Sequence, residues 1–236
     1  MSTRAGPDRT TRPQGKPAVA TNVLFDLDGT IWDSYEGITR TVVHTLRQLG
    51  VEVPAESDLV GHVGPPLAVM LAELGVPAQR IDEARDVYRD RYRQRGEFEC
   101  TVYPGAVDLL TELRAAGIAL ATATSKGVEP TRRMLAHFDL DHRFDVIAAA
   151  DMSARDHSKA DVIAAALAGL GDPPRSTVIM VGDRRYDIEG GRAHGLATVG
   201  VTWGYGTRAE LVDAGADAVV DSFDELADVL ATERAG

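Results

Sequence analysis

Two carboxylates stand one residue apart in the stretch VLFDLDGTIWDS, which spans residues 23–34. Asp26 and Asp28 follow a short apolar run and precede a Gly-Thr pair. Charged groups are costly where a strand leaves a protein core, so a cation is expected beside these two acids. Residues two apart in an extended chain share a face, which would let one acid attack an electrophile while the other moves a proton.

Polar residues also follow later apolar runs. They are the Ala123–Lys126 stretch ATSK, the pair Gly182-Asp183, Asp187, and Lys159 at the start of a helical pattern. Carboxylate oxygens are the ligands that Mg²⁺ prefers, whereas hydroxyls, backbone N–H groups and lysine bind phosphate. This combination is typical of phosphoryl transfer, in which a carboxylate nucleophile can form an aspartyl-phosphate.

Helical and strand patterns alternate from Tyr103 onward. With the run that begins at Val23, the short apolar stretches amount to about six strands, and their alternation with helices predicts a parallel sheet covered on both faces. In such a fold, side chains at the carboxyl ends of the strands meet at one edge, where ligands collect. We therefore expect an α/β protein with its candidate site at that edge.

Three regions differ in composition. Residues 1–20 are rich in Pro, Gly, Thr and Arg and contain few large apolar side chains, which predicts a disordered tail. Residues 35–100 show helical periodicity without a strand pattern, which predicts an inserted all-α cap domain. Residues 21–34 and 101–236 then form the catalytic core.

Charge and cysteine content exclude several classes of protein. The net charge of −11 argues against binding to nucleic acid or to an anionic membrane surface. No apolar run approaches the roughly 18 residues of a membrane span. A single cysteine, Cys100, excludes an internal disulfide framework and favours a reducing, cytoplasmic location. We expect a monomer or a homodimer.

The motifs resemble, in order, those of the haloacid dehalogenase superfamily. DLDGT at 26–30, ATSK at 123–126, Lys159 and GDRRYD at 182–187 match its four motifs, and VGPPL at 63–67 and GYG at 204–206 resemble one subgroup. The chain is similar to the phosphoglycolate phosphatase-like branch with a helical cap, over about residues 21–230. The resemblance implies a Rossmann-like core, with a parallel sheet flanked by helices, plus the inserted cap.

The resemblance also implies roles. Asp26 would be the nucleophile, and Asp28 would protonate the leaving alcohol and then activate water. Thr124, the N–H group of Ser125 and Lys159 would hold the phosphoryl oxygens. The implied Mg²⁺ ligands are Asp26, Asp28 through its backbone carbonyl, Asp183 and Asp187. An acid at position 28 favours phosphatases over the dehalogenases of the superfamily, which lack it.

Substrate-binding residues are harder to predict. The candidates are Gly29, Ser125, Trp32, His62 and Gly64. The Trp32 indole would either stack on a substrate or wedge the hinge of the cap. Thr122 shares a strand face with Thr124, but Thr124 is preferred because it directly precedes the Ser-Lys turn. Lys126 is interpreted as a solvated charge rather than a phosphate ligand, and GYG as a structural turn. The basic stretch YRDRYRQRG is expected to be solvated, although one of its arginines could meet a second anionic group.

We therefore expect a Mg²⁺-dependent phosphatase that acts on a small phosphate monoester through an aspartyl-phosphate. Phosphoglycolate, a nucleoside 5′-monophosphate and a sugar phosphate remain open as substrates. The alternative is a phosphotransferase that uses the same chemistry to phosphorylate an alcohol, including a protein tyrosine. Loss of Asp26 or Asp28 would indicate a non-catalytic protein, and both are present.

Overall fold

A computed structural model describes residues 20–150 and 158–235, so almost all of the predicted tail lies outside the described residues. Its centre is a six-stranded sheet in the order β5-β4-β1-β6-β7-β8, and every neighbouring pair is parallel. The strands are β1 (Asn22–Phe25), β4 (Ala119–Gly127), β5 (Val146–Ala150), β6 (Val178–Gly182), β7 (Ala197–Val201) and β8 (Ala218–Val220). The predicted parallel α/β fold is confirmed.

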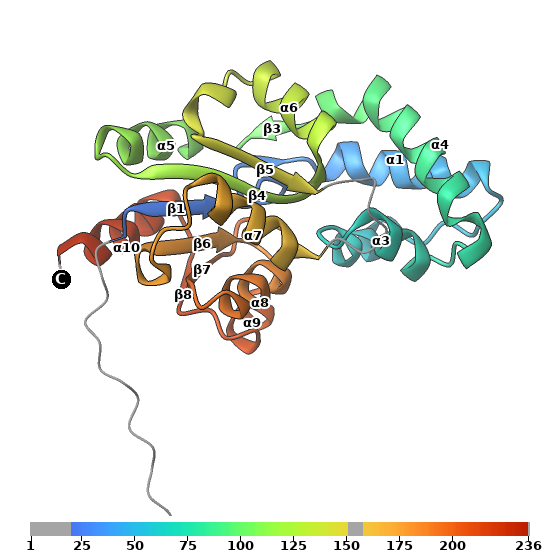
Figure 1. Cartoon of the computed structure of the whole chain (residues 1–236). Helices are drawn as coiled ribbons and strands as arrows, with labels where there is room; N and C mark the ends of the chain where they lie inside the picture. The colour runs from blue at the N-terminus through green and yellow to red at the C-terminus, as the bar shows by residue number, and fades with distance from the viewer. Residues whose placement is uncertain (1–19, 151–157, 236) are drawn as a thin grey trace, which may run out of the picture.

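Helices cover both faces of this sheet (Figure 1). They are α5 (Ala106–Ala115), α6 (Val128–His137), α7 (Lys159–Gly169), α8 (Arg185–Ala193), α9 (Arg208–Asp213) and α10 (Phe223–Ala235). Successive residues of β1 point to opposite faces: Val23 and Phe25 pack in a cluster with α5, α6 and α10, whereas Leu24 packs with α7. Burial on both faces explains why these strands are continuous apolar runs.

A helical cap is inserted between β1 and β4. It contains α1 (Tyr35–Gln48), α2 (Glu56–Leu59), α3 (Leu67–Glu73) and α4 (Ile81–Gln94), with 3₁₀ turns η1 (Val60–His62), η2 (Ala78–Arg80) and η3 (Gly96–Phe98). The turn η3 packs closely on α1. A Cβ atom added at Gly37 would lie 2.2 Å from the carbonyl oxygen of Gly96, so glycine is required at this contact. Figure 1 shows the cap beside the carboxyl ends of the central strands.

Two short antiparallel strands join the cap to the core. They are β2 (Trp32–Asp33) and β3 (Thr101–Val102), which pair with each other. Sequence patterns did not predict them, since two residues are too few to show a period. Two further 3₁₀ turns, η4 (Asp141–Arg143) and η5 (Arg175–Thr177), lie in core loops. Among the helices of residues 20–150 and 158–235, none is long and apolar enough to cross a membrane.

Candidate active site

The central position of β1 determines which residues meet. It lies between β4 and β6, and the N–H group of Asp26 donates to the carbonyl of Val181 at 2.9 Å. The residues that end these three strands are therefore neighbours: Asp26 after β1, Thr124 within the end of β4, and Asp183 after β6. All three are buried.

Lys159, the first residue of α7, reaches the same place. Its Nζ atom lies 2.9 Å from Asp26 Oδ1 and 2.7 Å from Asp187 Oδ1, and it donates to the carbonyl of Ala123 at 2.8 Å. Burial alone would lower the pKa of Lys159, but the carboxylates of Asp187 and Asp26 outweigh it and raise that pKa. The side chain is therefore a buried ammonium between two acids.

The two acids that contact this ammonium form a buried cluster with a third, Asp183. One oxygen each from Asp26, Asp183 and Asp187 lies within 4.8 Å of the others. Burial raises the pKa of Asp26 to about 7; Lys159 opposes this rise, while Asp187 and Asp28 add to it. Burial, followed by repulsion from Asp187 and Asp26, also raises the pKa of Asp183. The cluster holds three acids beside one ammonium, and its all-oxygen donor set fits a hard divalent cation such as Mg²⁺.

Close backbone packing holds Asp183. Its Oδ2 atom accepts a 2.7 Å hydrogen bond from the N–H group of Tyr205. Gly29 has φ of +83°, and a Cβ atom there would lie 2.3 Å from Asp183 Oδ2; a Cβ atom at Gly204 would lie 2.4 Å from it. The DLDGT and GYG motifs thus contact the same carboxylate, which places the GYG turn directly against the acidic cluster.

The two carboxylate oxygens of Asp187 have different partners. Its Oδ2 atom accepts from the N–H group of Arg184 at 3.0 Å, at the N-terminus of α8, while its Oδ1 atom faces Lys159. The helix end fixes one oxygen and thereby orients the other toward the cluster.

The contacts of Asp28 differ from those of Asp26. Its Oδ1 atom accepts from the indole N–H of Trp32 at 2.9 Å and from the Ser34 hydroxyl. Its Oδ2 atom lies 3.2 Å from Lys126 Nζ. Trp32 is fully buried, so the expectation that its indole contacts substrate is corrected: the ring packs at the hinge and orients Asp28.

The expectation that Lys126 is solvated is also wrong. Its side chain is only 7% exposed, and Nζ donates to the hydroxyl of Tyr92, in the cap, at 2.6 Å. Burial alone would lower the pKa of Lys126, but Asp28 and Tyr88 raise it. No local pattern could predict this contact, because the partner of Lys126 in the cap is 34 residues away in the chain.

The two candidate threonines have different surroundings. The Thr122 hydroxyl donates to the carbonyl of Ala148 at 2.7 Å, inside the sheet. Thr124 instead lines a cavity at the strand edge, together with Asp26, Asp28 and Ser125. Thr124 Oγ1 also accepts from the N–H group of Lys126 at 3.2 Å, which shapes the turn after it. This difference supports Thr124 over Thr122.

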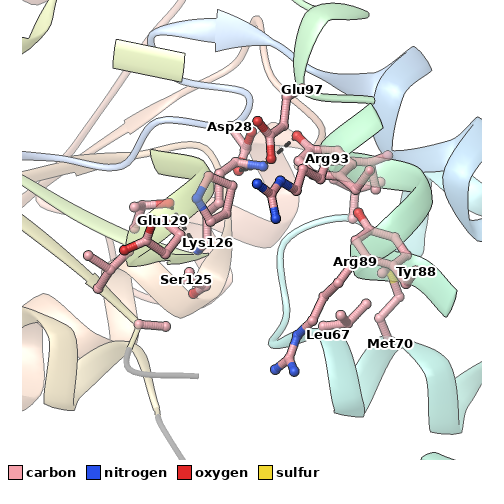
Figure 2. Close-up of a pocket in the computed structure, with 18 of the residues that line it drawn as sticks. Asp28, Leu67, Met70, Tyr88, Arg89, Arg93, Glu97, Ser125, Lys126 and Glu129 are labelled. Carbon is pink, nitrogen blue, oxygen red and sulfur yellow. Dashed lines mark hydrogen bonds and ion pairs between the residues drawn. The ribbon is translucent and has the colours of Figure 1, made fainter. Parts of the chain in front are cut away.

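The cavity lies between core and cap and has a volume of about 600 Å³. Gly64 lines it, whereas His62 does not and instead lies 3.3 Å from Glu73 through Nδ1. Tyr88, Arg89 and Arg93 of α4 also line it, as do apolar residues of α3 (Figure 2). Their signal was the spacing of YRDRYRQRG, which places positions 88, 89, 92 and 93 on one helix face.

Comparison with known proteins agrees with this geometry. The family model of haloacid dehalogenase-like hydrolases matches residues 23–201. Tyrosine-protein kinase PtkA of Mycobacterium tuberculosis (strain ATCC 25618 / H37Rv) is 43% identical over 212 residues, which cover 88% of this chain and 72% of that protein. A 5′-nucleotidase of Pseudomonas aeruginosa is 36% identical over 191 residues, covering 80% and 86%.

Solved structures are similar as well. A predicted phosphatase from Clostridium acetobutylicum superposes with a TM-score of 0.86 at 38% identity, covering 91% of this chain and all of that one (100%). Mycobacterium tuberculosis PtkA superposes with a TM-score of 0.78 at 40% identity, covering 90% and 98%. With four motifs gathered at one strand edge, this chain belongs to the haloacid dehalogenase-like hydrolase family and is one of its phosphatase-type enzymes.

Proposed function

We propose that the protein is a Mg²⁺-dependent phosphatase that hydrolyses a small phosphate monoester through an aspartyl-phosphate on Asp26. The observation that carries the proposal is the buried cluster of Asp26, Asp183 and Asp187 around Lys159, open to a cavity through Asp26. A cation and a phosphoryl group together would balance charges that the chain leaves uncompensated.

In the first half-reaction, a carboxylate oxygen of Asp26 attacks phosphorus. The bond between phosphorus and the ester oxygen breaks, and Asp28 gives its proton to the leaving alcohol. Lys159 holds Asp26 in place at 2.9 Å and, with Thr124 and the N–H group of Ser125, binds the phosphoryl oxygens.

In the second half-reaction, Asp28 takes a proton from water as the water oxygen attacks the same phosphorus. Phosphate leaves and the Asp26 carboxylate is regenerated. Trp32 and Ser34 hold Asp28 Oδ1, while Oδ2 lies beside Lys126, and Asp28 lines the cavity. Asp26, Asp183, Asp187 and the backbone carbonyl of Asp28 would hold Mg²⁺, which supplies positive charge to the phosphoryl group.

The cap supplies the other wall of the cavity. Gly64 and α4 close it opposite Ser125, so the leaving group must contact the cap. Phosphoglycolate, nucleoside 5′-monophosphates and sugar phosphates all belong to the proposed class.

We place the enzyme in the cytoplasm, as a monomer or homodimer. Cys100 is half-buried, and burial raises the pKa of its thiol to about 12. A thiol that stays protonated is unreactive, which supports a structural role for Cys100.

A phosphotransferase is the second candidate, and a specific observation favours it: a relative 43% identical is a tyrosine-protein kinase. Transfer to an alcohol would use the same nucleophile and the same acid, with the acceptor hydroxyl in place of water.

Phosphate release tests both candidates. Phosphoglycolate, nucleoside monophosphates, sugar phosphates and phosphopeptides are incubated with Mg²⁺ and the wild-type protein, with Asp26→Asn beside it. A preferred small substrate, lost in the variant, supports the phosphatase. Uniformly feeble release, together with labelled phosphate that appears on an added acceptor, supports the phosphotransferase. Equal release by both proteins would contradict both candidates.

A further inference from the structure

The cap side of the cavity is mostly apolar. Val63, Leu67, Met70 and Tyr88 line it opposite the catalytic acids, and the Tyr88 ring stacks on Tyr92 with centroids 5.5 Å apart. Cavities of a few hundred Å³ with such walls accept molecules of drug size. Glycolate, a two-carbon acid, would fill a small part of the roughly 600 Å³ and would leave this wall uncovered.

Most of the charged groups around the cavity are already paired. Lys126 pairs with Asp28, and Arg133 donates to both oxygens of Glu97 at 2.8 and 2.7 Å. On the rim, the Nη1 atom of Arg89 lies 3.8 Å from Oδ1 of Asp86, which is one turn earlier in α4.

Arg93 differs from these cations. Across residues 20–150 and 158–235, its guanidinium has neither a hydrogen bond nor an ion pair, although Asp90 lies one turn before it on the same rim. Figure 2 shows Arg93 extending from α4 across the cavity toward the side of Lys126, whereas Arg89 points the other way, past Leu67. An unpaired guanidinium at the exposed rim of a cavity is suited to bind a carboxylate or phosphate that enters it.

We propose, on the basis of the proposed function, that the preferred substrate is a phosphate monoester of a bulky, mostly apolar alcohol that carries a second anionic group. Leu67, Met70 and Tyr88 enclose the apolar part, and Arg93 binds the second anion. Phosphoglycolate has the anion without the apolar part, and a nucleoside monophosphate lacks the second anion, so both are poorer substrates.

Three alkyl phosphates separate the two features while keeping the leaving groups chemically similar. They are phosphoglycolate, benzyl phosphate and 4-carboxybenzyl phosphate. We expect wild-type kcat/KM to be highest for 4-carboxybenzyl phosphate, by about tenfold over benzyl phosphate, because the carboxylate gains a charged hydrogen bond.

Variants assign the preference to residues. Arg93→Gln should reduce the advantage of 4-carboxybenzyl over benzyl phosphate to about twofold or less. Arg95→Gln is the matched control: Arg95 is exposed at the end of the same helix and does not line the cavity, so the wild-type ratio should remain. Leu67→Gln should lower kcat/KM for both benzyl esters relative to phosphoglycolate by about fivefold.

The outcomes distinguish two failures. If phosphoglycolate or a nucleoside monophosphate of the earlier panel is hydrolysed in an Asp26-dependent way and 4-carboxybenzyl phosphate is not preferred, the substrate class is wrong and the proposed function stands. If Arg93→Gln keeps the wild-type preference for 4-carboxybenzyl over benzyl phosphate, Arg93 does not bind the second anion. If no ester yields more phosphate than it does with Asp26→Asn, the proposed function fails, and this inference fails with it.

Discussion

The two walls of the cavity are constructed differently. On the core side, acids at strand ends are buried and held by backbone groups: Asp26 by its place in the sheet, Asp183 by Tyr205 and Asp187 by the end of α8. On the cap side, Arg89 and Arg93 project from exposed positions of one helix. The core therefore provides a rigid arrangement of charges for one reaction, while substitutions in the cap can change which leaving group is bound without disturbing the fold.

The largest effect is expected at Asp26, the proposed nucleophile. Asp26→Asn should lower kcat by about four orders of magnitude or more, because the amide cannot form the aspartyl-phosphate. Steady-state phosphate release measures the loss, and circular dichroism checks the fold. Asp108→Asn, an exposed acid in α5, is the control and should keep wild-type turnover. Full activity of Asp26→Asn would refute covalent catalysis at this position.

The close approach of Gly29 to Asp183 is expected to support the proposed Mg²⁺ site. Gly29→Ala introduces a Cβ atom that would lie 2.3 Å from Asp183 Oδ2, so Asp183 must shift. We expect the Mg²⁺ concentration for half-maximal activity to rise by about 10- to 100-fold. Titration with Mg²⁺ after treatment with a chelator measures it.

Gly117→Ala is the matched control for that test. Gly117 also has positive φ, +78°, but nothing lies within 4 Å of an added Cβ atom. Both variants should lose about 1 kcal/mol of stability from backbone strain, whereas only Gly29→Ala should change the Mg²⁺ requirement. A similar Mg²⁺ requirement in both variants would show that Asp183 is not held by this contact.

The core side was largely predictable from sequence and the cap side was not. Asp26 and Asp183 each follow an apolar strand directly, so the topology of a parallel sheet brings them together whatever the details of packing. The contacts of Lys126 and Trp32 depend on how the cap and hinge pack, and no local pattern encodes that. The stretch that contains Arg93 is expected from sequence to be solvated, with the option left open that one of its arginines meets a second anionic group. Which arginine lies at the cavity follows from the placement of the cap.

The contact that joins the two walls gives a third prediction. Lys126→Met removes the ammonium that lies 3.2 Å from Asp28 Oδ2 and 2.6 Å from the Tyr92 hydroxyl. We expect kcat to fall by about tenfold with a smaller change in KM, because Asp28 loses a fixed partner. Tyr92→Phe, which keeps the ring, should reduce kcat by only about threefold.

The control for this contact is Tyr186→Phe, which removes an exposed hydroxyl bonded to Arg185 outside the cavity. Its kcat and KM should equal those of the wild-type enzyme. If Lys126→Met raised KM alone, Lys126 would bind the leaving group and would not position Asp28.

The smallest effect expected is on the stability of the metal-free protein, and it depends on pH. Burial raises the pKa of Asp26 from 3.8 to about 7, so the folded chain resists ionisation of a group that ionises readily when unfolded. The stabilising contribution of the protonated acid is present below about pH 4 and is lost as the pH rises through about 7. Asp26→Asn cannot ionise and escapes this loss. In the presence of a chelator, the Tm of the variant should therefore exceed that of the wild type by more at pH 8 than at pH 5. The difference between the two gaps should be about 3 °C or more. Thermal unfolding followed by circular dichroism measures both proteins.

Added Mg²⁺ should narrow the gap at pH 8, because the cation stabilises the ionised wild-type cluster. A gap that is equal at both pH values would mean that Asp26 ionises as easily in the folded core as in water, and the charge imbalance on the core side would then not exist.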